Sequence, residues 1–96
     1  MSSSAQRALS VLKALRGHSL SGLSNGQLAT HLNETPTNIT RALQDLAAAD
    51  LVQKLDNGNF AHTPLMEQIA LAHLNSLNQA EQRIKELQRR AAVHAG

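Results

Sequence analysis

A short run of polar side chains between residues 37 and 44 carries hydrogen-bonding groups that suit the base edges of a nucleic acid duplex. The side chains are Thr37, Asn38, Thr40, Arg41 and Gln44. An arginine can bridge two acceptors of guanine, asparagine or glutamine can bridge adenine, and threonine can bond to phosphate or touch a thymine methyl group. No acidic residue interrupts the set before Asp45. The run therefore predicts a surface for a major groove, with an ordinary solvated helix face as the alternative.

Two short helices joined by an abrupt turn are expected to position these side chains. Ser24 and Gln27 have the spacing of a capping box, which predicts a helix start directly after Ser24. Asn33 tolerates a positive φ and is expected to end this helix. Thr35 and Pro36 then supply the cap and the first residue of the next helix. Apolar residues at helical spacing predict the buried faces, namely Leu28, Ala29 and Leu32, then Ile39, Ala42, Leu43 and Leu46.

These residues belong to a longer pattern that is typical of a known family. The matching positions are Arg7-Ala8-Leu9, Val11-Leu12, Leu23-Ser24, Leu28-Ala29, Leu32, Pro36 to Ile39, Arg41, Leu43, Leu51-Val52 and Asp56 to Phe60. On these positions the segment from Gln6 to Pro64 resembles the winged helix-turn-helix DNA-binding domain of IclR-type (isocitrate lyase regulator) bacterial transcription factors. The resemblance implies that the reading positions are Thr37, Asn38, Thr40 and Arg41. Arg41 is the position most characteristic of the family.

The chain departs from the family pattern in three features. Asn33 stands in place of the usual turn glycine, and Asp50 in place of the glycine that follows the recognition helix. Both residue types tolerate left-handed backbone geometry. The large effector-binding domain of the family has no counterpart in these 96 residues, so no small-molecule effector is predicted.

The residues after the second helix predict a β-hairpin, the wing of such a domain. We expect strands at Leu51 to Leu55 and at Asn59 to His62, with a tight turn at Asp56-Asn57-Gly58 between them. Phe60, the only aromatic residue, is expected to hold the hairpin against the core. By analogy with the family, Lys54, Asn57 and Asn59 are predicted to reach phosphate or the minor groove, although a wing of this composition is equally ordinary without a ligand.

The predicted fold is mainly α (α+β), a winged helix-turn-helix with a small hairpin and a long C-terminal helix. With 42% hydrophobic but 1% aromatic residues, its core must consist of Leu, Ala, Val and Ile, which favours helices. We expect a disordered arm at residues 1–5, the DNA-binding domain at 6–63 and a dimerisation helix at 64–96. A first helix is indicated by Ala8, Val11, Leu12 and Leu15.

The long helix is predicted because Thr63-Pro64 repeats the cap-plus-proline signal and no helix breaker follows before the last residue. Leu65 and Ile69, with Leu74 as a further candidate, are expected to anchor its first turns to the domain. Further apolar residues alternate spacings of three and four, as in a coiled-coil seam, at Leu77, Ala80, Ile84, Leu87 and Ala91. Ion pairs are expected beside this seam, between Glu81 and Lys85 and between Glu86 and Arg90. A helix folded back on its own domain is the alternative.

Charge is modest for a protein that binds DNA. The net charge is +2, and residues 1–63 hold five Lys and Arg against four Asp and Glu. Since counterion release from phosphates drives much of the affinity for DNA, we expect a homodimer with two half-sites in successive major grooves, about 34 Å apart. The hydroxyls of Thr35, Thr37 and Thr40 are expected to add phosphate contacts.

No pattern in the sequence suggests catalysis. There is no cysteine, and the five histidines share no ligand spacing, so neither a metal nor a cofactor is predicted. No apolar run suits a signal peptide or a membrane span, and a cytoplasmic location is expected. The prediction is a sequence-specific, double-stranded DNA-binding transcriptional regulator, a repressor acting as a homodimer. The alternative is a winged-helix adaptor that binds other proteins and not DNA.

Overall fold

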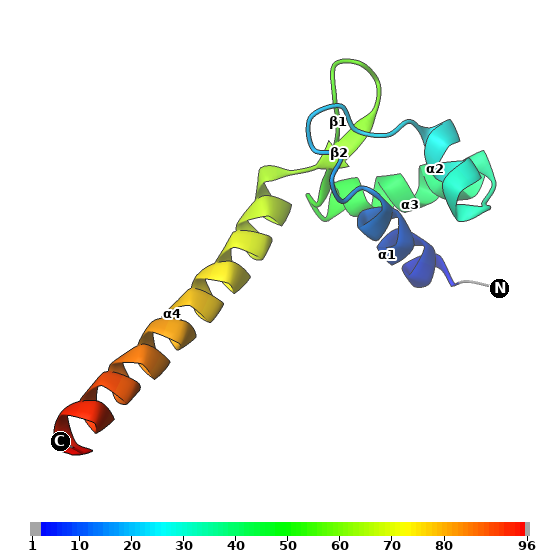
Figure 1. The fold of residues 1–96 in the computed structure, drawn as a ribbon. Coiled ribbons are helices and arrows are strands. Elements are labelled where there is room, and N and C mark those ends of the chain that lie inside the picture. The colour runs from blue at the N-terminus through cyan, green and yellow to red at the C-terminus, as the bar shows by residue number, and fades with distance from the viewer. Residues whose placement is uncertain (1–2, 96) are drawn as a thin grey trace.

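The computed structural model describes residues 3–95, and its elements follow the order expected of a winged helix-turn-helix (Figure 1). The elements are α1 (Ser4–Ala14), α2 (Asn25–Leu32), α3 (Pro36–Ala48), β1 (Val52–Lys54), β2 (Phe60–His62) and α4 (Pro64–Ala95). The first three helices and the hairpin form one small domain, and α4 projects away from it. The predicted fold class is confirmed.

The start of α1 lies earlier than the sequence analysis expected. Ser3 Oγ accepts a hydrogen bond from Gln6 N at 3.1 Å, and Gln6 Oε1 accepts one from Ser3 N at 2.9 Å. This capping box satisfies two amides at the helix start and fixes it at Ser4. The prediction of a disordered arm over residues 1–5 was therefore wrong for residues 3–5, and its first two residues lie outside the described part of the chain.

The core is made where α1, α2 and α3 meet. Val11 and Leu15 of α1, Leu28 of α2 and Ile39 of α3 have no solvent exposure at all. Burial of one such aliphatic side chain contributes about 1.5–3 kcal/mol relative to full exposure. The apolar residues at helical spacing in α3 are all buried, so this helix has one side in the core and its other side in solvent.

The turn between α2 and α3 forms through the predicted local signals. Ser24 Oγ accepts from Gln27 N at 3.1 Å, and Gln27 Oε1 accepts from Ser24 N at 2.9 Å. Asn33 adopts the left-handed conformation with φ of 54°. Thr35 Oγ1 caps α3 by accepting from the Asn38 amide at 3.1 Å. The caps and the left-handed residue predicted from the sequence are confirmed.

The wing is a two-stranded antiparallel hairpin in which Val52 pairs with His62 and Lys54 with Phe60. Leu23 adds one bridge, because its amide and carbonyl bond to those of Phe60 at 2.9 and 2.8 Å. Both strands are shorter than predicted, but the turn lies where expected, with Gly58 at a φ of 86°.

Thr63 joins the domain to α4 and is 3% exposed. Its hydroxyl donates to the Asp50 carbonyl and accepts from the Met66 amide, so it caps the long helix. The helix then leaves the domain, and Ile69 is already 50% exposed. The expected anchoring of the first turns of α4 was wrong, because Leu65, Ile69 and Leu74 are all exposed. The alternative of a helix folded back on its own domain is contradicted as well, because α4 extends into solvent (Figure 1).

The projecting helix makes the molecule elongated, with extents of 66 × 33 × 21 Å. None of the helices in residues 3–95 combines the length and the apolar character needed to cross a membrane.

Candidate nucleic-acid interface

The solvent side of α3 presents three polar side chains that form no hydrogen bond or ion pair with any other residue the structure describes. Thr37, Arg41 and Gln44 lie opposite the buried residues of the helix and are exposed. Within residues 3–95, no hydrogen bond or ion pair engages any of these three side chains. Each can therefore bond to a ligand without breaking a contact that holds the fold.

Two other predicted residues of α3 have partners inside the domain. Thr40 Oγ1 donates to the Pro36 carbonyl at 3.0 Å and accepts from Asn25 Nδ2 at 2.9 Å. Asn38 is half-buried, and its Nδ2 donates to Glu34 Oε2 at 3.2 Å. These contacts tie the start of α3 to α2 and to the preceding turn. A role of both residues toward a ligand stays a prediction.

The first helix contributes residues beside α3 that the sequence analysis did not identify. Ser4 and Arg7 line an open hollow together with five residues of α3, namely Asn38, Arg41, Ala42, Gln44 and Asp45. Two arginines against one aspartate give this side of α3 a positive balance. No local spacing could reveal the hollow, because α1 and α3 are separated in sequence and meet only through the core.

The wing residues predicted to contact DNA hold a neighbouring loop in this structure. Asn57 Nδ2 and Asn59 Nδ2 both donate to the Ser21 carbonyl, at 3.0 and 3.1 Å. The next residue, Gly22, lies so close that a Cβ built on it would be 2.5 Å from the Phe60 carbonyl oxygen. The asparagines thus fasten the loop to the wing, and their contact with DNA stays a prediction.

Lys54, the remaining predicted wing residue, is exposed and pairs across the hairpin with Phe60. Its Nζ lies 5.9 Å from the centre of the Phe60 ring, at the outer limit of a cation–π contact. The ring itself is half-buried and packs on the core, as predicted. The lysine charge therefore lies at the wing surface, and its contact with phosphate stays a prediction.

The Asn59→Ala variant is expected to lower the free energy of unfolding by about 1 kcal/mol, the net value of one hydrogen bond. The variant loses the bond to the Ser21 carbonyl, and urea unfolding followed by circular dichroism measures the change. Lys54→Ala, also in the hairpin but without a side-chain hydrogen bond, is the matched control and should lose less stability than Asn59→Ala. Equal stability of Asn59→Ala and the wild type would argue that the bond from Asn59 to the Ser21 carbonyl does not stabilise the fold.

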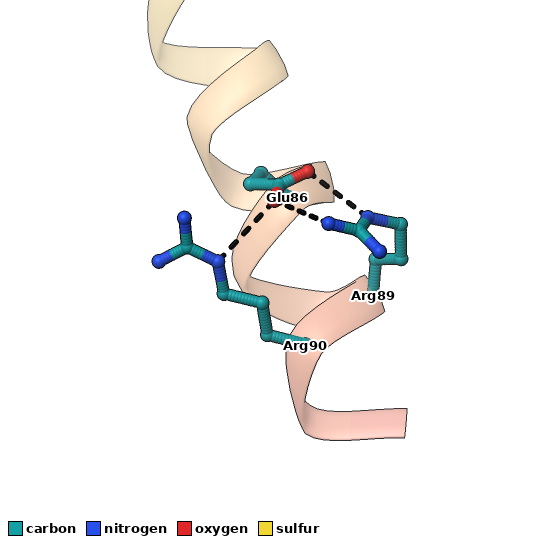
Figure 2. Close-up of polar contacts among 3 residues, drawn as sticks. All are labelled: Glu86, Arg89 and Arg90. Atoms are coloured by element: carbon teal, nitrogen blue, oxygen red, sulfur yellow. Dashed lines mark hydrogen bonds and ion pairs between the residues drawn. The ribbon is translucent and has the colours of Figure 1, made fainter. Parts of the chain in front are cut away.

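The flanks of α4 carry the predicted ion pairs. Lys85 Nζ lies 3.2 Å from Glu81 Oε1, and Glu86 accepts from Arg89 at 2.6 and 3.1 Å and from Arg90 at 3.2 Å (Figure 2). The hydrogen bonds from Arg89, with a smaller contribution from Arg90, hold the pKa of Glu86 below its usual value in spite of partial desolvation. Both predicted pairs are confirmed, and they leave the apolar seam between them uncovered.

No group of three His, Cys, Asp or Glu side chains gathers into a possible metal site among the described residues. Two surfaces remain as candidates for contacts with other molecules, namely the exposed side of α3 and the apolar side of α4.

Comparison with known proteins adds one match. The family model of the IclR helix-turn-helix domain matches residues 4–56, which contain α1, α2, α3 and β1. This range agrees with the resemblance described from the sequence. No curated protein and no solved structure matches the chain.

Proposed function

Because the chain belongs to the IclR helix-turn-helix domain family and is thus a DNA-binding transcription regulator, we propose that it acts as a homodimeric repressor at a specific operator. The observation that supports the DNA interface most directly is the unpaired, exposed set of Thr37, Arg41 and Gln44 on α3. In a helix-turn-helix the second helix lies in the major groove. The polar side of α3 then faces the base edges.

Within the groove, Arg41 is proposed to bridge O6 and N7 of a guanine, and Gln44 to bridge N6 and N7 of an adenine. The hydroxyl of Thr37, near the start of α3, is suited to a phosphate. Lys54 of the wing and Arg7, which lines the hollow beside α3, supply further positive charge. The proposal also includes the other predicted DNA contacts, although these side chains form the hydrogen bonds within the domain described above. They are Thr35, Asn38, Thr40, Asn57 and Asn59.

The homodimer supplies affinity that one domain lacks. Residues 1–63 carry a net charge of only +1, so few phosphates are neutralised by each copy. Two copies on an inverted repeat combine their contacts. The proposed contact between copies is the apolar seam of α4, in which Leu77, Ile84 and Leu87 are each more than half exposed.

Repression is proposed because it requires only that the protein occupies its operator. A dimer bound across an operator excludes other proteins from the same stretch of duplex.

The direct test is selection of binding sites from random duplex DNA, repeated at two salt concentrations. An enriched inverted repeat whose binding weakens with salt is the expected result. A reporter gene placed downstream of that repeat then tests the sign of regulation. A repressor should lower expression of the reporter, and expression should be restored when the protein is absent. Absence of any enriched sequence at low salt would contradict the proposed function.

A second candidate function is favoured by the same low charge together with the uncovered side of α4. A winged helix can serve as an adaptor whose long helix binds another protein. In that case the chain associates with a protein partner in a salt-insensitive way and fails to retain DNA at low salt. The selection experiment therefore separates the two functions.

A further inference from the structure

The α4 helix carries one long, mainly apolar side that its own domain leaves exposed beyond Met66. From residue 66 to residue 91 the positions on this side are Met66, Ile69, Ala70, His73, Leu77, Ala80, Ile84, Leu87 and Ala91. Leu77, Ile84 and Leu87 are 53%, 55% and 53% exposed. A stripe of this length on a helix surrounded by solvent marks a contact surface.

We propose that this stripe binds the same stripe of a second copy, with the two α4 helices antiparallel and Leu77 opposite the partner's Ala80. The inference rests on the homodimer of the proposed function and gives it a direction and a register. It does not depend on DNA binding.

Side-chain size along the stripe favours this register. It places Ala70 opposite the partner's Leu87 and Ala80 opposite the partner's Leu77, while Ala91 meets the partner's Met66. Every alanine of the seam then faces a long side chain, so the distance between the helices can stay constant. A parallel pair in register would instead stack alanine on alanine and leucine on leucine, which leaves voids beside the alanine layers.

Charge along the helix favours the same direction. Residues 64–78 carry a single charged side chain, Glu67, whereas residues 79–95 carry four Lys and Arg against two Glu. Antiparallel pairing sets the positive half of each helix beside the negative half of its partner. It also opposes the two helix dipoles. A parallel dimer would bring the two positive halves together.

Neighbouring antiparallel registers fit less well. A shift by one heptad in one direction places Leu77 opposite the partner's Leu87, so two long side chains meet in one layer, and it leaves Met66 without a partner on α4. A shift in the other direction places Ala70 opposite the partner's Ala80 and leaves Leu87 without a partner on α4. The proposed register overlaps the two helices along their whole length, about 45 Å.

This arrangement fixes where the two DNA-binding domains lie. With α4 helices antiparallel, the two Thr63 joints stand about 45 Å apart, at opposite ends of the helix pair. The spacing exceeds the roughly 34 Å between successive major grooves on one side of the duplex. Half-sites about two helical turns apart are therefore expected, in place of the adjacent grooves anticipated from the sequence.

Disulfide trapping without DNA tests the direction, because the chain contains no cysteine of its own. Ala70→Cys and Leu87→Cys chains, tagged to differ in mass, are mixed and oxidised gently. The expected product is the mixed disulfide, with little disulfide from either variant alone, since two copies of position 70 lie about 25 Å apart in the antiparallel pair and a disulfide needs Cα atoms within about 7 Å. Leu71→Cys, exposed but off the stripe, should not cross-link.

Disulfides formed by each variant with itself would show parallel helices and overturn the inference. So would a mass in light scattering other than that of two chains. The pair Met66→Cys and Ala91→Cys repeats the test at the helix ends, in case the Leu87 substitution weakens the dimer. A mixed disulfide from a protein that selects no DNA sequence would overturn the proposed DNA function and leave the dimer standing.

Discussion

The Arg41→Ala variant is expected to lose about 1–3 kcal/mol of binding free energy at each half-site, and so about 2–6 kcal/mol for a dimer on its selected operator. The side chain is exposed and has no bond within residues 3–95, so its removal leaves the fold intact. Fluorescence anisotropy with labelled operator measures the affinity. Thermal unfolding by circular dichroism checks that the variant is as stable as the wild type.

Arg41→Lys is the matched control, because it keeps the positive charge but loses the planar fork that bridges guanine. We expect this variant to lose discrimination between the operator and a scrambled duplex while its salt dependence changes little. Gln44→Ala should likewise relax the preference at one base pair. Unchanged operator binding by both alanine variants would show that α3 does not read the sequence.

The Leu87→Glu variant is expected to be monomeric at concentrations where the wild type is a dimer. A carboxylate buried in the seam costs several kcal/mol unless it is paired, and symmetry introduces two of them, so the dimer should weaken at least about a thousandfold. Light scattering or sedimentation measures the mass. Operator affinity should fall as well, since the half-sites no longer combine. Ile84→Glu should behave in the same way.

Leu71→Glu separates loss of the seam from a general effect of adding charge to α4. Leu71 is 56% exposed and Leu87 53%, but Leu71 lies off the apolar stripe. This control should remain dimeric. If Leu87→Glu and Ile84→Glu also remain dimeric, the contact between copies lies elsewhere on the molecule.

The local features of the fold were readable from sequence because each depends on residues three or four apart. The capping box at Ser24 and Gln27, the left-handed Asn33 and the cap at Thr35 all have the predicted geometry. The capping box of Ser3 and Gln6 has the same spacing and was equally readable. The arm prediction missed it because a serine-rich start resembles a disordered terminus.

Contacts between distant segments were beyond the reach of pattern and spacing. The hydrogen bonds from Asn57 and Asn59 to the Ser21 carbonyl join residues more than 30 positions apart in the sequence. The bond from Asn25 to Thr40 similarly depends on how α2 crosses α3. Sequence alone assigned Asn57, Asn59 and Thr40 to contacts with DNA. It could not tell that the fold itself uses their hydrogen-bonding groups.

The periodicity of apolar residues did not predict what the apolar side of α4 contacts. Apolar residues at spacings of three and four predict which side of a helix is buried, but not against what. The anchoring expected for Leu65 and Ile69 assumed that the domain offers a surface to them. In the structure the capped joint at Thr63 directs α4 away from the domain, so its apolar side is exposed to solvent beyond the first turn.

Because α4 is long, small changes of backbone angle at the buried Thr63 joint move its far end by a large distance. An angular change of about 10° at the joint displaces the far end of a 45 Å helix by about 8 Å. Hydrogen bonds from Thr63 to Asp50 and from Met66 to Thr63 resist such bending. In the proposed dimer, the stiffness of this one joint therefore sets the rotational phase at which the two domains meet the duplex. An operator with half a turn of DNA inserted between its half-sites would present the second one on the opposite face of the helix, out of reach.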